Sequence, residues 1–233
     1  MVEHIVMELA QHQGDTTMGT PKRPLFVGVQ GPQGSGKTYL TSILRDELLR
    51  SPHNLRVAVL SADDLYLPHS GLTALAHAHP DNRLLHGRGQ PGTHDLPLGT
   101  KLLSSLREIN IPVTPEAPPR TVRLPVFDKS LHNGEGDRVP EAEWPEAEGP
   151  LDVVLLEGWF VGFGPVTAEE LDARYNSPEA LKGLSRDIFD LQRFCRHDDV
   201  REINEIIYDY IDWWKQLDAF IQVGGYFNYI RVH

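Results

Sequence analysis

Residues 31–38 read Gly-Pro-Gln-Gly-Ser-Gly-Lys-Thr and fit the phosphate-binding pattern G-x-x-x-x-G-K-[ST]. The apolar run at residues 25–30 predicts a buried strand before this loop, and residues 39–50 after it carry leucine and isoleucine at helical spacing. Strand, glycine loop and helix follow one another in the order that lets backbone N–H groups at a helix N-terminus enclose a phosphate. The sequence therefore predicts binding of a nucleoside triphosphate.

Two side chains at the end of this loop have predicted roles. Lys37 is expected to reach the β- and γ-phosphate oxygens, and the Thr38 hydroxyl is expected to face Mg²⁺. The guanine-reading string N-K-x-D and the phosphate-sensing string D-x-x-G do not occur in the chain, which argues against a GTPase. We expect ATP and Mg²⁺ as cofactors. The predicted cofactor contacts are Gly31, Gln33, Gly34, Ser35, Gly36, Lys37 and Thr38.

Composition excludes several classes of protein. The 233 residues fit one α/β domain with insertions. The formal net charge of −11 argues against general binding to nucleic acid or to an anionic membrane. Cys195 is the single cysteine, so no disulfide forms within the chain, and no apolar run approaches a membrane span. We expect a cytoplasmic protein with a small-molecule partner, and its oligomeric state is left open.

Three further apolar runs, at residues 55–61, 151–156 and 218–223, predict strands buried on both faces, as in a parallel sheet. The predicted fold is a three-layer α/β sandwich of the P-loop NTPase class. We divide the chain into an N-terminal extension, residues 1–23, and a P-loop domain, residues 24–233.

A long insertion at residues 67–150 is rich in proline, glycine and histidine and is expected to bind the acceptor of the reaction. Within it, only residues 99–109 have a clear helical pattern, and residues 110–120 and 140–150 are predicted to be loops. Beyond it, residues 199–217 predict a long amphipathic helix with Asp198 or Asp199 as N-cap.

Acidic residues follow two of the predicted strands. Glu157 ends the strand at residues 151–156 and suits Mg²⁺ or its water shell, with Gly158 leaving room for a substrate. Asp63 and Asp64 end the strand at residues 55–61, where a carboxylate can take the proton of a hydroxyl acceptor. We predict that Asp63 is this base and that Asp64 supports it or binds a metal-bound water. The alternative is a pair of solvated aspartates in a turn.

Several cations lie in glycine-rich loops of this acidic chain and are candidates for contact with an acidic substrate. Arginine suits a bidentate grip on a carboxylate. A histidine next to an aspartate could orient the acceptor hydroxyl, although this pair alone is weak support for a metal site or a triad. The other interpretation of each cation is a surface charge. The candidate substrate residues are Arg88, His94, Asp95, Lys129 and Arg138.

Taken together, these segments resemble the D-glycerate 3-kinase group of fungi and plants, within the superfamily of phosphoribulokinase, uridine kinase and pantothenate kinase. The resemblance covers residues 24–223 and implies ATP-dependent phosphorylation of a small hydroxy acid. Its first candidate is D-glycerate, which would become 3-phosphoglycerate, and Asp63 matches the catalytic base. The matching segments are residues 31–37, 61–66, 87–95, 127–130, 134–138 and 157–159.

The sequence departs from this group at its C-terminal end. Members of the group continue into a helix whose arginine is expected to cover the transferring phosphoryl, whereas this sequence stops at His233. We interpret the sequence as C-terminally shortened, without that lid helix. Two alternatives to a glycerate kinase follow: a P-loop nucleotide-binding protein with weak or no turnover, and a kinase of pantothenate or of a nucleoside.

Overall fold

The computed structural model describes residues 1–14, 22–114, 116–176, 191–224 and 230–232. Its central five-stranded sheet has the order β2-β7-β1-β8-β9, in which the first four strands are parallel and β9 is antiparallel to β8. The strands are β1 (Leu25–Gln30), β2 (Val57–Ser61), β7 (Val153–Gly158), β8 (Ala219–Val223) and β9 (Ile230–Val232). The predicted α/β sandwich with a mostly parallel sheet is confirmed.

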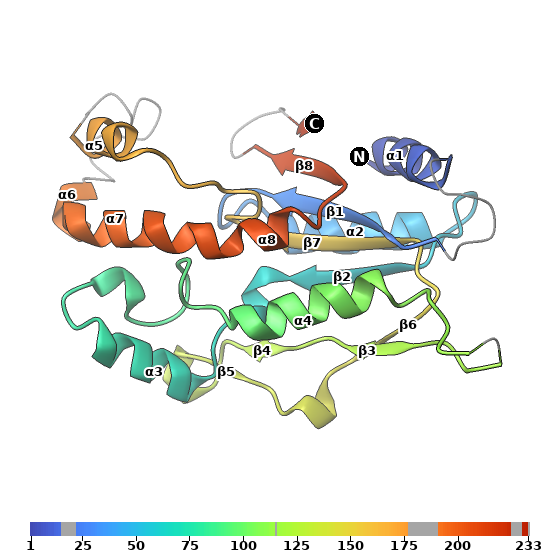
Figure 1. The fold of residues 1–233 in the computed structure, drawn as a ribbon, viewed down its shortest axis with the longest axis horizontal. Coiled ribbons are helices and arrows are strands. Elements are labelled where there is room, and N and C mark those ends of the chain that lie inside the picture. Colours follow the sequence, from blue (N-terminus) through green and yellow to red (C-terminus); the bar gives the residue numbers. More distant parts are fainter. Residues whose placement is uncertain (15–21, 115, 177–190, 225–229, 233) are drawn as a thin grey trace.

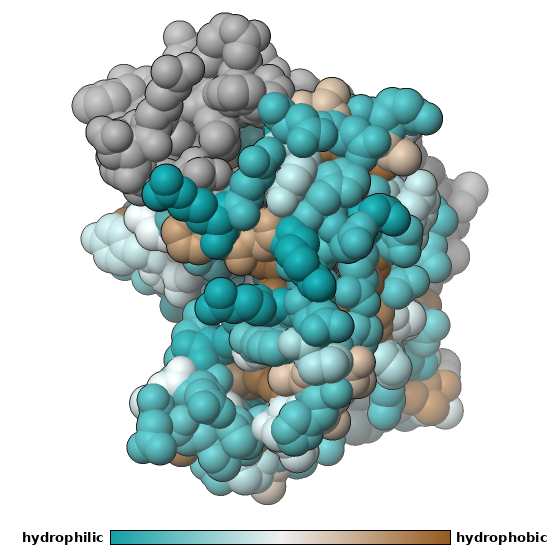
Figure 2. All heavy atoms as spheres, turned by 90° about the vertical axis from the view of Figure 1, so that its left-hand side faces the viewer, coloured by the Kyte–Doolittle hydropathy of each residue, from teal (hydrophilic) through white to brown (hydrophobic). Residues whose placement is uncertain are grey.

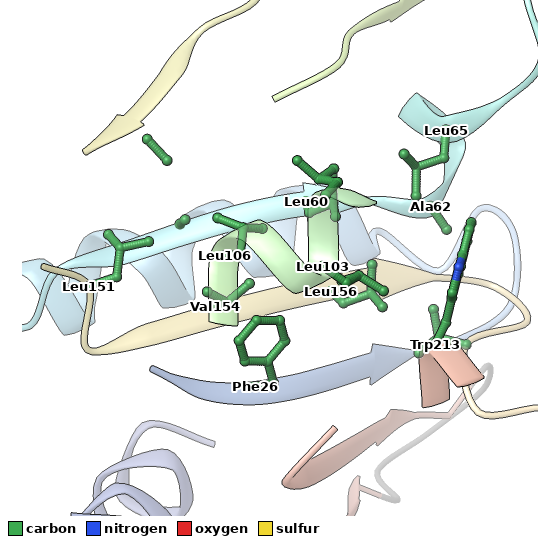
Figure 3. Packing of buried hydrophobic residues seen from close by; sticks show 14 of the residues in the cluster. Phe26, Leu60, Ala62, Leu65, Leu103, Leu106, Leu151, Val154, Leu156 and Trp213 are labelled. Atoms are coloured by element: carbon green, nitrogen blue, oxygen red, sulfur yellow. The ribbon is translucent and has the colours of Figure 1, made fainter. Parts of the chain in front are cut away.

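Helices cover both faces of the sheet, which is why every residue of β1 and β7 is buried. One face packs against α4 (Leu96–Arg107) and α8 (Ile211–Trp214), as Figure 3 shows for Phe26, Val154 and Leu156 beside Leu103, Leu106 and Trp213. The other face packs against α1 (Val2–Gly14) and α2 (Lys37–Leu49). Two apolar cores therefore fix the sheet between layers of helices (Figure 1).

The packing of α4 on α8 depends on a glycine. A Cβ atom built at Gly99 would lie 2.0 Å from Cζ2 of Trp213, which is 1% exposed. Only a residue without a side chain allows the indole to approach the helix this closely.

The N-terminal helix α1 is part of the same fold. Its side chains Ile5 and Leu9 are buried in the core that also contains Leu44 and Leu48 of α2. The described part of the predicted extension at residues 1–23 thus contributes a packed helix.

The insertion at residues 67–150 has more regular structure than predicted. It contains a second helix, and one strand, at residues 146–148, lies within the segment 140–150 that was predicted as a loop. Short strands pair locally, β3 with β6 and β4 with β5, both antiparallel. The elements are α3 (His69–Ala78), η2 (Arg83–Leu85), α4, β3 (Thr121–Arg123), β4 (Phe127–Asp128), η3 (His132–Gly134), β5 (Asp137–Arg138), η4 (Glu141–Glu143) and β6 (Glu146–Glu148).

The predicted helix at residues 199–217 is divided into three parts: α7 (His197–Ile206), η6 (Ile207–Tyr210) and α8. The predicted N-cap is wrong, because the cap position is Arg196. Asp199 instead accepts a hydrogen bond from the backbone N–H of Arg196 at 2.8 Å from inside the first turn. The remaining elements are η1 (Ala62–Leu65), α5 (Ala168–Asn176) and α6 (Leu191–Phe194).

Among the described helices, none has both the length and the apolar character needed to cross a membrane.

Candidate active site

A cavity of about 930 Å³ lies at the carboxyl ends of the parallel strands. The strands run towards the left-hand side in Figure 1, and Figure 2 views that side directly and shows a mostly hydrophilic surface. One wall consists of the P-loop, the end of β7 and η1, which directly follows β2. The other wall consists of α3 and loops of the insertion. The cavity therefore joins the predicted nucleotide site to the predicted acceptor site.

The P-loop wall has the predicted backbone shape. Gly36, at the N-cap of α2, has a φ of 78°, a left-handed conformation that favours glycine. Lys37 Nζ donates to the backbone oxygen of Pro32 at 2.8 Å, across the loop. Burial lowers the pKa of Lys37, against the opposing effects of Glu157 and Asp63. The predicted cofactor contacts that line the cavity are Gln33, Gly34, Gly36, Lys37 and Thr38, whereas Gly31 and Ser35 do not line it.

The carboxylate of Glu157, at the end of β7, is buried between two hydroxyl groups. Thr38 Oγ1 donates to Glu157 Oε1 at 3.2 Å, and Ser61 Oγ donates to the same oxygen at 2.7 Å. Within the described part of the chain, no group of three or more His, Cys, Asp or Glu side chains gathers as a metal site. Mg²⁺ at phosphates is commonly held by one or two carboxylates and by substrate oxygens, so the oxygen donors of Thr38 and Glu157 fit it. Ser61 was not among the predicted site residues, although it ends β2 opposite Glu157.

Asp63 lies in η1, directly after β2, and lines the cavity. Its two carboxylate oxygens have different partners: Tyr66 donates its hydroxyl to Oδ1 at 2.9 Å, and Lys129 Nζ donates to Oδ2 at 2.6 Å. Burial alone would raise the pKa of Asp63, but the hydrogen bonds from Lys129 and Tyr66 outweigh it and hold this pKa below its usual value. The residue predicted as base is therefore an ionised carboxylate at neutral pH.

Asp64 points to a different partner. Its Oδ1 accepts a hydrogen bond from the backbone N–H of Phe127 at 3.0 Å, and Asp64 is not among the residues that line the cavity. Burial raises its pKa to about 6, against this hydrogen bond. In this geometry Asp64 connects η1 to β4, and its predicted role at the metal stays a prediction.

Two of the predicted substrate residues, Arg88 and Lys129, line the cavity. Arg88 Nη1 donates to the backbone oxygens of Gly134, at 2.7 Å, and of Glu135, and its guanidinium carbon lies 5.9 Å from the ring centre of Phe127. These contacts fix one edge of the guanidinium. Among the described residues, no hydrogen bond involves Arg88 Nη2, so this nitrogen can donate to an anion.

The other three predicted substrate residues are placed behind the cavity wall. Arg138 Nη1 donates to Asp95 Oδ2 at 3.0 Å, and its Nη2 donates to the backbone oxygen of Tyr66 at 2.7 Å. His94 is 3% exposed and stacks on Tyr66 with ring centres 4.5 Å apart, and burial lowers its pKa to about 3. None of the three lines the cavity: His94 and Arg138 contact Tyr66, whose hydroxyl contacts Asp63, and Asp95 contacts Arg138. Their predicted contact with the substrate stays a prediction.

Sequence reasoning missed the wall formed by α3. Leu72, Thr73 and Ala76 line the cavity from this helix, at the spacing of one helical face. His69 and Glu135 also line it, and His69 Nε2 lies 2.7 Å from Glu135 Oε2. The spacing of Leu72 and Ala76 is the pattern in the sequence that could have indicated this helix, but a pattern of one helical turn is too short to predict a helix.

The chain is similar to known kinases, although no family model matches it. The chloroplastic D-glycerate 3-kinase of Arabidopsis thaliana is 38% identical over 166 residues, which are 71% of this chain and 35% of that protein. An uncharacterised kinase of Schizosaccharomyces pombe is 34% identical over 201 residues, which are 83% of this chain and 69% of that kinase. Bacterial uridine and pantothenate kinases match at lower identity, 26% and 27% in two examples.

A solved structure of a kinase is also similar to this chain. The D-glycerate 3-kinase from Cryptococcus neoformans superposes with a TM-score of 0.81 at 39% identity, covering 95% of this chain and 70% of that structure. This chain thus spans about a third of the length of the Arabidopsis relative, at 35%, and most of the fungal structure.

Proposed function

Because the chain belongs to the D-glycerate 3-kinase-like family of P-loop kinases, we propose that it transfers the γ-phosphoryl group of ATP to a hydroxyl of a small organic acid. The first candidate for this acid is D-glycerate. The product would then be 3-phosphoglycerate. The observation that carries this proposal is that the P-loop, Asp63 and Arg88 line one cavity.

The nucleotide end of the cavity supports the first half of the reaction. Lys37 and the backbone of the P-loop offer donors to phosphate oxygens, and Thr38 and Glu157 would hold Mg²⁺. When bound there, Mg²⁺ supplies positive charge that neutralises the phosphates. Lys37 and the backbone of the P-loop would orient the triphosphate.

The acceptor end supports the second half. Asp63 is held by Tyr66 at one oxygen, and the ionised carboxylate can take the proton of an attacking hydroxyl at the other. Arg88, fixed by the backbone of residues 134 and 135, can bind the carboxylate of an acid in the same cavity. A hydroxyl and a carboxylate on one small molecule would satisfy both residues.

An ADP-release assay tests the proposal. Purified protein is incubated with ATP, Mg²⁺ and, in separate reactions, D-glycerate, pantothenate or uridine, with the Lys37→Ala protein as a control for contaminating kinases. We expect release of ADP that depends on D-glycerate and is absent from the control. Release that depends on uridine but not on D-glycerate would reject the acid.

One observation favours a second candidate, a nucleotide-binding protein with weak turnover. Both oxygens of Asp63 already accept hydrogen bonds, from Tyr66 and Lys129, so a hydroxyl acceptor would have to compete for Oδ2. Binding of ATP without turnover on any of the three acceptors would favour this candidate.

A further inference from the structure

Lys129 lies at the oxygen of Asp63 that an acceptor hydroxyl must approach. Its Nζ is 2.6 Å from Oδ2, while Tyr66 occupies Oδ1. The Lys129 side chain is 53% exposed and lines the cavity. Any hydroxyl that gives its proton to Asp63 therefore does so beside the ammonium group of Lys129.

A second cation of the cavity, Arg88, suits the carboxylate of the acid better than Lys129 does, because a guanidinium offers paired donors to a carboxylate. Arg88 is held at a different place, by the backbone of Gly134 and over the ring of Phe127.

Two observations indicate that the charge of Lys129 acts on the phosphates. An ammonium group has three N–H donors, and in the described part of the chain only Asp63 accepts one from Lys129. Burial lowers the pKa of Lys37, and the positive charge of Lys129 lowers it further, so the two ammonium groups act on the same region of the cavity.

We propose that Lys129 is a catalytic residue whose ammonium group bridges Asp63 and the transferring phosphoryl group, an inference that rests on the phosphotransfer proposed above. As the acceptor oxygen bonds to the γ-phosphorus, its proton passes to Asp63. The bond from the γ-phosphorus to the bridging oxygen breaks, and its electron pair leaves with ADP. Lys129 offsets the repulsion between Asp63 and the phosphoryl oxygens and stabilises the charge of the transition state.

The test compares the affinities of the Lys129→Met protein for Mg-ADP and for the Mg complex of the β,γ-imido analogue of ATP, by titration calorimetry. We expect the substitution to weaken binding of the analogue about tenfold, as for loss of one charge-assisted hydrogen bond, and to leave ADP binding unchanged. Lys129→Arg keeps the charge and should retain most of the preference for the analogue. Lys215→Met is the matched control, since Lys215 pairs with Asp212 at 2.8 Å outside the cavity.

Equal affinities of the wild-type and Lys129→Met proteins for the analogue would overturn the proposal. In turnover, the proposal requires a lower kcat with an unchanged KM for the acid, and a raised KM with normal kcat would also overturn it. The binding experiment needs no acceptor. A wild-type protein that binds both nucleotides but phosphorylates no acid would contradict the proposed function, while the role of Lys129 at the γ-phosphoryl would still be decided by the calorimetry.

Discussion

The two walls of the cavity are built in different ways. The nucleotide wall comes mainly from one continuous segment, in which the buried strand β1, the P-loop and α2 follow one another directly, with the end of β7 beside it. The acceptor wall is assembled from segments far apart in the sequence, tied together mostly by side chains that bond to backbone: Asp64 to Phe127, Arg138 to Tyr66, and Arg88 to Gly134.

This difference separates the two halves of the proposed reaction. A continuous loop of backbone donors can bind phosphate whatever the acceptor, whereas the acceptor wall depends on individual side chains. Substitutions on one wall should therefore change the parameters of one substrate. Asp63 lies where the walls meet and should affect the chemical step most.

The largest effect is expected on the nucleotide wall. Lys37→Ala removes the ammonium group that reaches the phosphates, so binding of ATP and nearly all activity should be lost. Calorimetry with ATP measures this, with a thermal unfolding curve to show that the protein is folded. Lys101→Ala, an exposed lysine on α4, is the control. Retained affinity for ATP would contradict the assignment of the loop.

The next largest effect is expected where the walls meet. Asp63→Asn keeps the shape of the side chain but removes the base, so kcat should fall by about 10² to 10⁴ while the affinity for ATP stays within a few-fold. Steady-state rates and ATP titration measure the two quantities separately. Loss of ATP binding together with normal turnover of the bound nucleotide would remove Asp63 from the role of base.

A smaller effect is expected on the acceptor wall. Arg88→Gln should raise the KM for the acid about ten- to a hundredfold, the range for loss of a charge-assisted hydrogen bond, with the KM for ATP little changed. Arg123→Gln is the matched control, because Arg123 pairs with Glu146 between β3 and β6, outside the cavity. A rise in the KM for ATP instead would place Arg88 on the nucleotide wall.

The smallest effect concerns stability. Burial raises the pKa of Asp64 to about 6 in the folded protein, so the protonated form of Asp64 is favoured there. Its contribution to the free energy of unfolding is fully present below the pKa of Asp64 in the unfolded chain and is lost as the pH rises through 6. Asp64→Asn keeps an acceptor for the N–H of Phe127 and removes this titration. Between pH 5 and pH 8 the wild type should lose about 1 kcal/mol more unfolding free energy than the variant, measured with urea in the presence of a chelator. Parallel pH profiles would contradict the raised pKa.

The sequence predicts the nucleotide wall well because its signals are local. The P-loop is one contiguous motif, and the four parallel strands are apolar runs. The expected burial on both faces is observed for β1 and β7, whereas β2 and β8 are only partly buried. These elements need no knowledge of distant contacts. Their order along the chain already places the loop at the carboxyl end of β1.

The acceptor wall could not be predicted in the same way. The helix α3 is short, contains Gly71 and follows Pro68. At its start, the backbone N–H of His69 donates a hydrogen bond to Asp137, which lies far along the chain. His94 and Arg138 have the chemistry of substrate ligands, but packing on Tyr66 decides their place. A sequence shows the type of a side chain in such a wall but not whether it faces the cavity.

The most direct test of the account is the identity of the product, measured by ³¹P and ¹³C NMR after incubation of the wild-type protein with ATP, Mg²⁺ and D-glycerate. The account predicts 3-phosphoglycerate and ADP in equal amounts, since the terminal hydroxyl would meet Asp63 while the carboxylate binds Arg88. Release of ADP and inorganic phosphate with unchanged D-glycerate, or phosphorylation at the other hydroxyl, would contradict it.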